Sequence, residues 1–193
     1  MVFVGAHIMK IATFVSLVST VGLLAACTQD ASVASSGSVP PSAAPTAKAA
    51  LVANDGAARG EAMITQSADG LRVRVRAAGL TPGAHAVHIH MTGRCTPPDF
   101  ASAGGHWNPT GRQHGKDNPQ GMHMGDMPNM IAGSDGIGEV EYLVSDGVIS
   151  GGTMPLLDAD GAAVVVHAQA DDYKSDPAGN AGGRVLCGVV AAG

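Results

Sequence analysis

The 193-residue chain has few aromatic and few charged side chains. Aromatic residues make up 3% of the chain, and Asp, Glu, Lys and Arg together make up 14%. The 11 Lys and Arg are outnumbered by 16 Asp and Glu, which gives a formal net charge of −5 at pH 7. Proteins that bind nucleic acid use a surplus of positive charge to neutralise phosphates. The charge balance therefore argues against a nucleic-acid partner.

A stretch long enough to span a membrane is lacking at the N-terminus. The apolar run from Ile11 to Leu23 follows Lys10, whereas a transmembrane helix needs about 20 consecutive apolar residues. A positive charge followed by a short apolar run is typical of a secretory signal peptide. Translation is expected to start at Met9, because residues 1–8 add nothing that such a signal peptide needs.

Leu24-Ala25-Ala26-Cys27 resembles a bacterial lipobox, in which the cysteine is acylated and becomes the mature N-terminus. The simpler alternative is an ordinary cleaved signal peptide followed by an incidental cysteine. On the lipobox interpretation, residues 1–26 are a lipoprotein signal peptide. Cys27 then holds the protein in the bacterial cell envelope by a lipid anchor, facing the periplasm. Thr28 in place of Asp favours the outer membrane over the inner one.

Large apolar residues are almost absent from residues 27–48, which are rich in Ala, Ser and Pro. Such a segment cannot bury enough surface to offset its ordering entropy, so a flexible tether is expected. Residues 49–193 are then a single domain, since typical domains hold about 100–150 residues. Loss of residues 1–26 removes Lys10 alone among the charged residues, leaving ten Lys and Arg against 16 acids, a net charge of −6.

Helical periodicity is lacking after the signal peptide. Residues 71–76 alternate apolar and charged side chains, as in a strand with one buried face, and Asp69-Gly70 supplies a hairpin turn. Arg72, Arg74 and Arg76 then lie on a solvated face and do not form a basic binding surface. Strands are expected at residues 61–66, 71–76, 84–91, 138–144, 162–167 and 184–190. The pattern predicts an all-β protein, a Greek-key β-sandwich or flattened antiparallel barrel.

Two segments, residues 92–128 and 168–183, interrupt the strand pattern, and loops of this length are usually functional. Six of the eight histidines lie between residues 83 and 126, and a seventh, His167, ends a strand-like segment. In a chain with so few aromatic and charged residues, this clustering indicates a metal site. His85 lies outside the spacing of the others and is interpreted as an ordinary strand or edge histidine.

The spacing of the histidines predicts two ions. Side chains two apart on a strand point to the same face, so His88 and His90 can reach one ion together. Imidazoles with one carboxylate suit a closed tetrahedral zinc site, and imidazoles alone with one position open suit copper. The seven candidate ligands are too many for one ion and suit two ions that share a ligand. They are His88, His90, His106, His114, His123, Asp126 and His167.

Six motifs resemble those of the copper-zinc superoxide dismutases of the bacterial cell envelope. In chain order they are HIH, GRC, GGHWNPTGRQHG, HMGDMPN, VVVHAQADD and GNAGGRVLCG, and the resemblance covers residues 49–192. It implies that His106 bridges the two metals as an imidazolate. The implied copper ligands are His88, His90, His106 and His167, and the implied zinc ligands are His106, His114, His123 and Asp126.

The same resemblance implies dismutation of superoxide to oxygen and hydrogen peroxide. Arg184 is expected at the copper mouth, where its permanent charge holds the anion. His106 is expected to leave copper on reduction, take up a proton and return it to the departing peroxide. Asp171 resembles the family aspartate that links a copper histidine to a zinc histidine. Ala178 departs from the family, which has a threonine on the anion channel.

The chain has three cysteines, Cys27, Cys95 and Cys187. If Cys27 carries a lipid, one pair remains, in a compartment that permits disulfides. The resemblance pairs Cys95 with Cys187, and two separate buried thiols are the alternative. The oligomeric state is left open between a monomer and a homodimer.

A copper-binding or copper-buffering protein without dismutase activity is the alternative function. Family relatives that lose ligands or the arginine become such proteins, whereas this chain keeps all seven ligands and Arg184. The role of the methionines around His123 is also left open between copper binding and packing. Thioethers favour Cu(I) and would suit a copper-docking patch, but methionine more often fills gaps in irregular packing, which is preferred here. These residues are Met122, Met124, Met127 and Met130.

Overall fold

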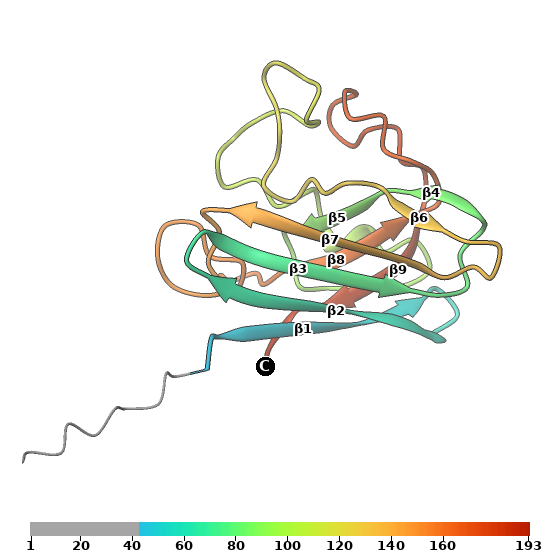
Figure 1. Ribbon diagram of the computed structural model, residues 1–193, viewed down its shortest axis with the longest axis horizontal. Coiled ribbons are helices and arrows are strands. Elements are labelled where there is room, and N and C mark those ends of the chain that lie inside the picture. Colours follow the sequence, from blue (N-terminus) through green and yellow to red (C-terminus); the bar gives the residue numbers. More distant parts are fainter. Residues whose placement is uncertain (1–42) are drawn as a thin grey trace, which may run out of the picture. The chain divides into compact units, whose positions relative to one another are not determined.

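Strands dominate the part of the chain that the computed structural model describes, residues 43–193 (Figure 1). The expected signal peptide, Cys27 and residues 27–42 of the expected tether lie outside it. The strands are β1 (Thr46–Ala53), β2 (Ala58–Ser67), β3 (Gly70–Ala77), β4 (Gly83–His85), β5 (Val87–His90), β6 (Met130–Ala132), β7 (Gly138–Ser145), β8 (Ala163–His167), β9 (Arg184–Val189) and β10 (Ala191–Ala192), with a single 3₁₀ turn, η1 (Ala101–Ala103). Within these residues, no helix is long and apolar enough to cross a membrane.

Alternation along β3 sets the two faces of the sheet. Leu71, Val73 and Val75 are fully buried, while the arginines between them face solvent. Arg72 and Arg74 form 2.8 Å ion pairs with Glu141 and Glu139 of the neighbouring strand β7. The interpretation of this stripe as a solvated face is therefore confirmed.

The sheet is antiparallel and closes almost completely into a barrel. Its strand order is β4-β6-β7-β3-β2-β1-β9-β8-β5, with β10 paired to β1. The first and last strands of this path, β4 and β5, are separated by Ala86 alone, so the two ends of the sheet meet. The interior is filled by buried aliphatic side chains, each worth about 1.5–3 kcal/mol on burial. These include Leu51, Ile64, Val73, Ile89 and Val164. The all-β prediction is confirmed.

The prediction of one continuous strand over residues 84–91 was wrong. The chain changes partner at Ala86, because β4 pairs with β6 whereas β5 pairs with β8. The Ala86 N–H donates to the Gln169 carbonyl, and the His167 N–H donates to the Ala86 carbonyl. This corner of the barrel ties the strand that carries His88 and His90 to the end of β8.

Three strands have no counterpart among the expected ones, β1, β6 and the two-residue β10. β1 begins at Thr46, so the last three residues of the expected tether, 46–48, lie in a strand paired with β2. Its inward residues are small, with Ala47 and Ala49 buried beside Leu51. The three-residue β6 completes the sheet edge between β4 and β7.

Three connections between strands surround the histidines that were expected to bind metal. The β5–β6 connection (residues 91–129) and the β8–β9 connection (residues 168–183) project from the same side of the barrel in Figure 1. They are joined by a 2.6 Å hydrogen bond from the His114 N–H to Asp176 Oδ1. The third, residues 146–162 between β7 and β8, was not among the expected functional loops. The Cys95–Cys187 disulfide, expected from the family resemblance, joins the first connection to β9 with a Cα–Cα distance of 5.7 Å, which confirms the pairing.

Candidate metal centre

Four histidines converge on the outer face of the barrel, since Val87 and Ile89 of β5 face the core and the residues that alternate with them face the other way. His88 and His90 come from β5, His167 ends β8, and His106 lies in the β5–β6 connection. All four are buried, and one ring nitrogen of each lies within 4.8 Å of the others. His88 Nδ1 is 3.2 Å from His167 Nε2. His90 Nε2 and His106 Nε2 are buried without any hydrogen-bond partner. Buried polar atoms without partners are costly, so this nitrogen cluster fits a bound metal ion.

The outer ring nitrogens of the four histidines are held by fixed acceptors. His88 Nε2 donates to Asp171 Oδ2 at 2.8 Å, and His90 Nδ1 donates to the Gly104 carbonyl at 2.9 Å. His106 Nδ1 is 2.8 Å from Asp126 Oδ1. His167 Nδ1 is 3.4 Å from the Gly182 carbonyl. For His88, His90 and His167 such partners fix the tautomer and leave the other nitrogen of the ring free for a metal.

A second group surrounds one carboxylate oxygen. Asp126 Oδ1 lies 2.8 Å from His106 Nδ1, 3.0 Å from His114 Nδ1 and 3.2 Å from His123 Nδ1. The nitrogens of His106 and His123 are 3.3 Å apart. Ligands about 2.0–2.1 Å from a tetrahedral zinc ion are about 3.3 Å from one another. Three imidazoles and one carboxylate at this spacing fit zinc.

His88 also lies within 4.8 Å of His106, His114 and Asp126. It is nevertheless a poor fourth member of the second group, because its Nε2 is bonded to Asp171 and its Nδ1 lies beside His167. His123 fits better, since its Nδ1 is 3.2 Å from Asp126 Oδ1. The two sets therefore share one residue, His106, which presents Nε2 to the first group and Nδ1 to the second.

Asp171 links the two groups through its two oxygens. Its Oδ2 accepts from His88 Nε2 at 2.8 Å, and its Oδ1 accepts from His114 Nε2 at 2.9 Å. The Tyr173 N–H also donates to Oδ1 at 2.6 Å. Gly179, at φ +63°, packs against this carboxylate, and a Cβ there would collide with both Asp171 and His114. A glycine is therefore required at this position.

Burial controls the protonation of the first group. Desolvation lowers the pKa of His106 to about 4 and that of His167 to about 3. It also lowers the pKa of His90 well below its ordinary value. These rings are consequently neutral at pH 7, the form that binds metals.

The second group carries the negative charge. Burial opposes ionisation of Asp126, but hydrogen bonds from His106, His114 and His123 outweigh it and pull the pKa of this carboxyl below its usual range. Burial likewise lowers the pKa of His114, yet its bonds to Asp126 and Asp171 dominate and raise it to about 9. An ionised carboxylate among imidazoles is the donor set that zinc prefers.

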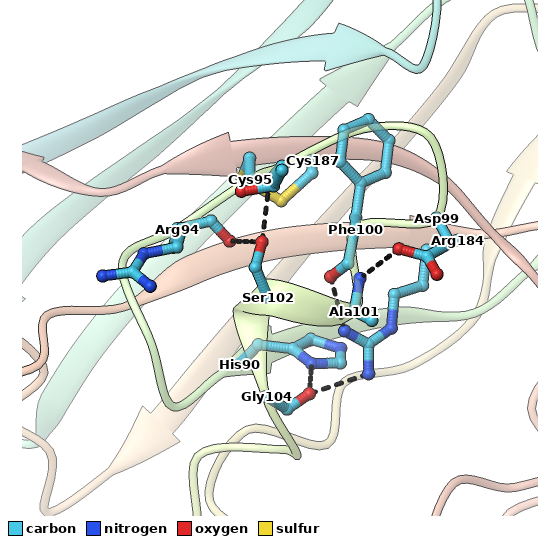
Figure 2. Close-up of a disulfide and its surroundings, with 11 residues drawn as sticks. His90, Arg94, Cys95, Asp99, Phe100, Ala101, Ser102, Gly104, Arg184 and Cys187 are labelled. Atoms are coloured by element: carbon cyan, nitrogen blue, oxygen red, sulfur yellow. Dashed lines mark hydrogen bonds between the residues drawn. A yellow bond between two sulfur atoms is a disulfide. The ribbon is translucent and has the colours of Figure 1, made fainter.

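Arg184 lies at the start of β9 with its guanidinium beside the first group (Figure 2). Its Nη1 donates to the Phe100 carbonyl and its Nη2 to the Gly104 carbonyl, both at 2.7 Å. Burial lowers the pKa of this half-buried side chain, but arginine retains its charge in proteins. Together with His90, His106 and His167, Arg184 lines a cavity of about 750 Å³.

Some residues that were not predicted from the sequence also contribute to the site and its surroundings. The connection 146–162 adds Asp158 and Asp160 to the walls of this cavity. His85, expected to be an ordinary strand or edge histidine, is buried in β4 and touches the group from behind: its Nδ1 is 2.7 Å from the His167 carbonyl and its Nε2 is 2.8 Å from the Thr81 carbonyl. Its position three residues before His88 was the sequence signal that could have indicated a place next to the histidine cluster.

The methionines near His123 divide into two pairs. Met127 and Met130 are buried in the main core, as the packing interpretation expects. Met122 and Met124 are half-buried and line a separate cavity of about 330 Å³. That cavity also contains Arg112, whose positive charge disfavours the approach of a copper ion.

Comparison with known proteins agrees with this geometry. Residues 58–190 match the family model described as copper/zinc superoxide dismutase (SODC). The chain is 44% identical over 146 residues to superoxide dismutase [Cu-Zn] 2 of Aquifex aeolicus, covering 75% of this chain and 85% of that one. It is 42% identical over 150 residues to the superoxide dismutase [Cu-Zn] of Caulobacter vibrioides, with the same coverage.

A solved structure shows the same fold. The crystal structure of a double mutant of a SOD-like protein from Bacillus subtilis superposes with a TM-score of 0.71 at 43% identity, covering 74% of this chain and 95% of that one. The barrel, the two groups of metal-binding side chains and the match over most of the domain lead to one conclusion: the chain belongs to the copper/zinc superoxide dismutase family.

Proposed function

We propose that the protein dismutes superoxide to oxygen and hydrogen peroxide at a copper site that shares His106 with a zinc site. The observation that carries this proposal is the pair of buried, unpartnered nitrogens, His90 Nε2 and His106 Nε2, next to a cavity that Arg184 also lines. The proposed copper ligands are His88, His90, His106 and His167, and the proposed zinc ligands are His106, His114, His123 and Asp126.

Bound copper supplies the alternation between Cu(II) and Cu(I) that two successive superoxide anions require. Arg184 attracts the anion and orients it, since its guanidinium is permanently charged and is fixed by the Phe100 and Gly104 carbonyls. His106 Nε2 has no partner in the protein and can hold the proton that peroxide needs. Its Nδ1 meanwhile stays with the Asp126 group, so the ring does not turn away.

The zinc group has a structural role in this proposal. His114 and His123 lie in the β5–β6 connection, and Asp171, which contacts His114, lies in the β8–β9 connection. An ion held by His106, His114, His123 and Asp126 pins the first connection, and Asp171 transmits this constraint to the second. The ring of His106 is thereby held in place for copper.

The experiment that tests this function is metal removal and replacement. The purified protein is stripped with a chelator, and the rate of superoxide disappearance is measured after copper, zinc or both are returned. We expect activity with copper plus zinc and none with zinc alone. A protein that binds one copper per chain but leaves superoxide decay at the uncatalysed rate would instead be a copper-binding protein.

The N-terminus adds a proposal about location. A lipobox ending in Cys27, followed by an Ala-, Ser- and Pro-rich segment, supports a lipid-anchored protein in the bacterial envelope that faces the periplasm. Incorporation of a labelled fatty acid into the wild type, and its loss in Cys27→Ser, tests the anchor. Equal labelling of the two proteins would exclude Cys27 as the acylated residue.

A further inference from the structure

The cavity in front of the proposed copper ligands is much larger than superoxide requires. Its volume is about 750 Å³, while a water molecule, which is of similar size to this diatomic anion, occupies about 30 Å³ in the liquid. Its walls come from all three connections, including Met91 of the β5–β6 connection, Asp158 and Asp160 of the β7–β8 connection, and Ala178 of the β8–β9 connection. Most of these walls therefore have no role in holding a two-atom substrate.

The charge of the walls is unfavourable for an anion. Apart from the histidines, the charged lining residues in the described part of the chain are Asp158, Asp160 and Arg184. Both aspartates are exposed, and Arg184 is half-buried. Two carboxylates against one guanidinium give the metal-free cavity a formal charge of −1, and the whole chain, which includes these three groups, has a formal net charge of −5 at pH 7. Such a cavity attracts cations.

Local hydrogen bonds fix the turn that carries the two aspartates. Asp158 Oδ1 accepts from the backbone N–H groups of Asp160 and Gly161, both at 3.0 Å. The Asp160 carbonyl accepts from the Gly93 N–H at 2.8 Å, which ties this turn to the segment after Met91. The rim is thus a fixed part of the cavity wall.

Met91 adds a soft donor to the same wall. It directly follows His90, and 48% of its surface is exposed. Its side chain lies over two glycines: a Cβ built on Gly104 would be 3.1 Å from Met91 Cγ, and one built on Gly105 would be 3.9 Å from Met91 Sδ. Because neither glycine has a side chain, nothing from these two positions separates the thioether from the backbone that leads into His106.

We propose that Met91, Asp158 and Asp160 form a capture site for copper ions at the cavity mouth. The carboxylates concentrate the cation, and the Met91 thioether holds Cu(I) before the ion passes to the unpartnered nitrogens of His90 and His106. The inference rests on the proposed copper ligands but not on dismutase activity. It assigns copper capture to this rim in place of Met122 and Met124, whose cavity contains Arg112.

The same carboxylates have the opposite effect on the two ions that use the cavity. They speed the approach of copper and slow the approach of superoxide. Their removal should therefore slow copper loading and accelerate capture of superoxide by the loaded enzyme. A residue with a purely structural role would not shift these two rates in opposite directions.

The experiment measures copper loading of the full chain, purified with zinc bound and without copper. Trp107 is the one tryptophan of the chain, lines the cavity and follows His106, so its fluorescence reports the arrival of copper. The probes are Cu(II) in a weakly coordinating buffer and Cu(I) in anaerobic acetonitrile-containing buffer. Metal analysis at the end point confirms one copper per chain.

The first comparison is Asp158→Asn/Asp160→Asn against Asp55→Asn/Asp135→Asn. The control removes the same net charge, and Asp55 and Asp135 are exposed aspartates that also accept a backbone N–H two residues on, outside this cavity. At low salt the rim variant should load either form of copper slower by a factor on the order of 10, with the difference shrinking as salt screens it. Its kcat/KM for superoxide, once loaded, should rise. Equal loading by the rim variant and the wild type, or equal slowing in the control, would overturn the proposal.

The second comparison is Met91→Leu against Met63→Leu, since Met63 is exposed to 44% and lies on β2 away from the cavity. Met91→Leu should slow loading of Cu(I) by about threefold or more but leave loading of Cu(II) unchanged, because the thioether prefers the monovalent ion. Unchanged Cu(I) loading in Met91→Leu would remove Met91 from the capture site. Lack of dismutase activity in the loaded wild type would refute the proposed function and leave both loading comparisons valid.

Discussion

Arg184 and His90 share one hydrogen-bond acceptor, the backbone carbonyl of Gly104 (Figure 2). Arg184 Nη2 donates to it at 2.7 Å and His90 Nδ1 donates at 2.9 Å. The proposed anion-binding residue and a proposed copper ligand are therefore positioned by the same peptide group. Gly104 follows η1, in the segment that the Cys95–Cys187 disulfide ties to β9.

Substitutions at Arg184 should separate its charge from its geometry. Arg184→Lys keeps the charge but cannot span the Phe100 and Gly104 carbonyls as a planar fork does. Arg184→Glu reverses the charge beside the copper site. We expect kcat/KM for superoxide to fall about 10-fold or more further in Arg184→Glu than in Arg184→Lys, with a changed salt dependence. Pulse radiolysis at several ionic strengths measures kcat/KM and its salt dependence. Equal rates for the two variants at low salt would place the arginine outside the substrate path.

The disulfide should contribute to stability and to the position of Arg184. Cys95 and Cys187 are 92 residues apart in the sequence, and loss of a native disulfide in a small secreted domain costs about 2–5 kcal/mol. The double variant Cys95→Ser/Cys187→Ser should lower the free energy of unfolding of the metal-free protein by that amount, measured in urea. It should also lower kcat/KM, because the Phe100 and Gly104 carbonyls lose their tie to β9. An unchanged unfolding midpoint would contradict the first expectation.

His85 should position the copper ligand His167. Its Nδ1 contacts the His167 carbonyl at 2.7 Å and its Nε2 contacts the Thr81 carbonyl at 2.8 Å. An asparagine amide lies near the place of Nδ1, and a glutamine amide near that of Nε2. His85→Asn should therefore keep copper affinity, whereas His85→Gln should lose about 10-fold or more.

Competition with a copper chelator measures these affinities, and the copper EPR spectrum reports the ligand geometry. Unfolding of the two metal-free variants is the control, since both lose one of the two bonds. If the loss of copper affinity in each variant matched its loss of unfolding free energy, His85 would be a packing residue only.

The metal-free protein should be most stable near neutral pH. The pKa of His114 in the folded protein is raised from 6.5 to about 9, so its contribution is complete below pH 6.5 and is lost as the pH rises through about 9. His106 and His167 have lowered pKa values, about 4 and about 3, so the unfolded chain binds more protons below pH 6.5. Stability therefore also falls as the pH drops from about 6.5 toward 4.

Urea midpoints with a chelator present, from pH 4 to pH 10, test this dependence. The matched variant His114→Gln should show a smaller decline between pH 6.5 and 9. A wild-type midpoint that rises steadily over that interval would contradict the assignment of a raised pKa to His114.

The sequence predicted strands from two signals, alternation as in β3 and a short continuous apolar run as in β8. β3 forms where residues 71–76 were expected to be extended, because its buried and exposed residues alternate, and β7 over residues 138–144 alternates in its first half. β1 was not recognised, since its inward residues include Ala47 and Ala49, which give a weak apolar signal. The division of residues 84–91 at Ala86 depends on which strand each half pairs with. That choice is not encoded in local alternation.

The metal-binding side chains could be found from sequence because their motifs are local and chemically distinctive. The cavity rim could not, since Asp158 and Asp160 come from a connection without histidines and reach the site through the 2.8 Å bond to Gly93. His85 resembles any strand histidine until the fold brings the carbonyl of His167 to its Nδ1. Both features depend on contacts between residues more than 60 positions apart.

The most direct test of the central claim, copper-dependent dismutation with His106 shared by two metals, compares His167→Gln with His123→Gln. Each removes one imidazole from one group, and both residues lie outside the shared position. Copper and zinc content is measured together with superoxide disappearance. We predict that His167→Gln loses copper and all activity but retains zinc, while His123→Gln loses zinc preferentially and keeps copper-dependent activity at a reduced level. Full activity in a His167→Gln protein of verified metal content would contradict the account.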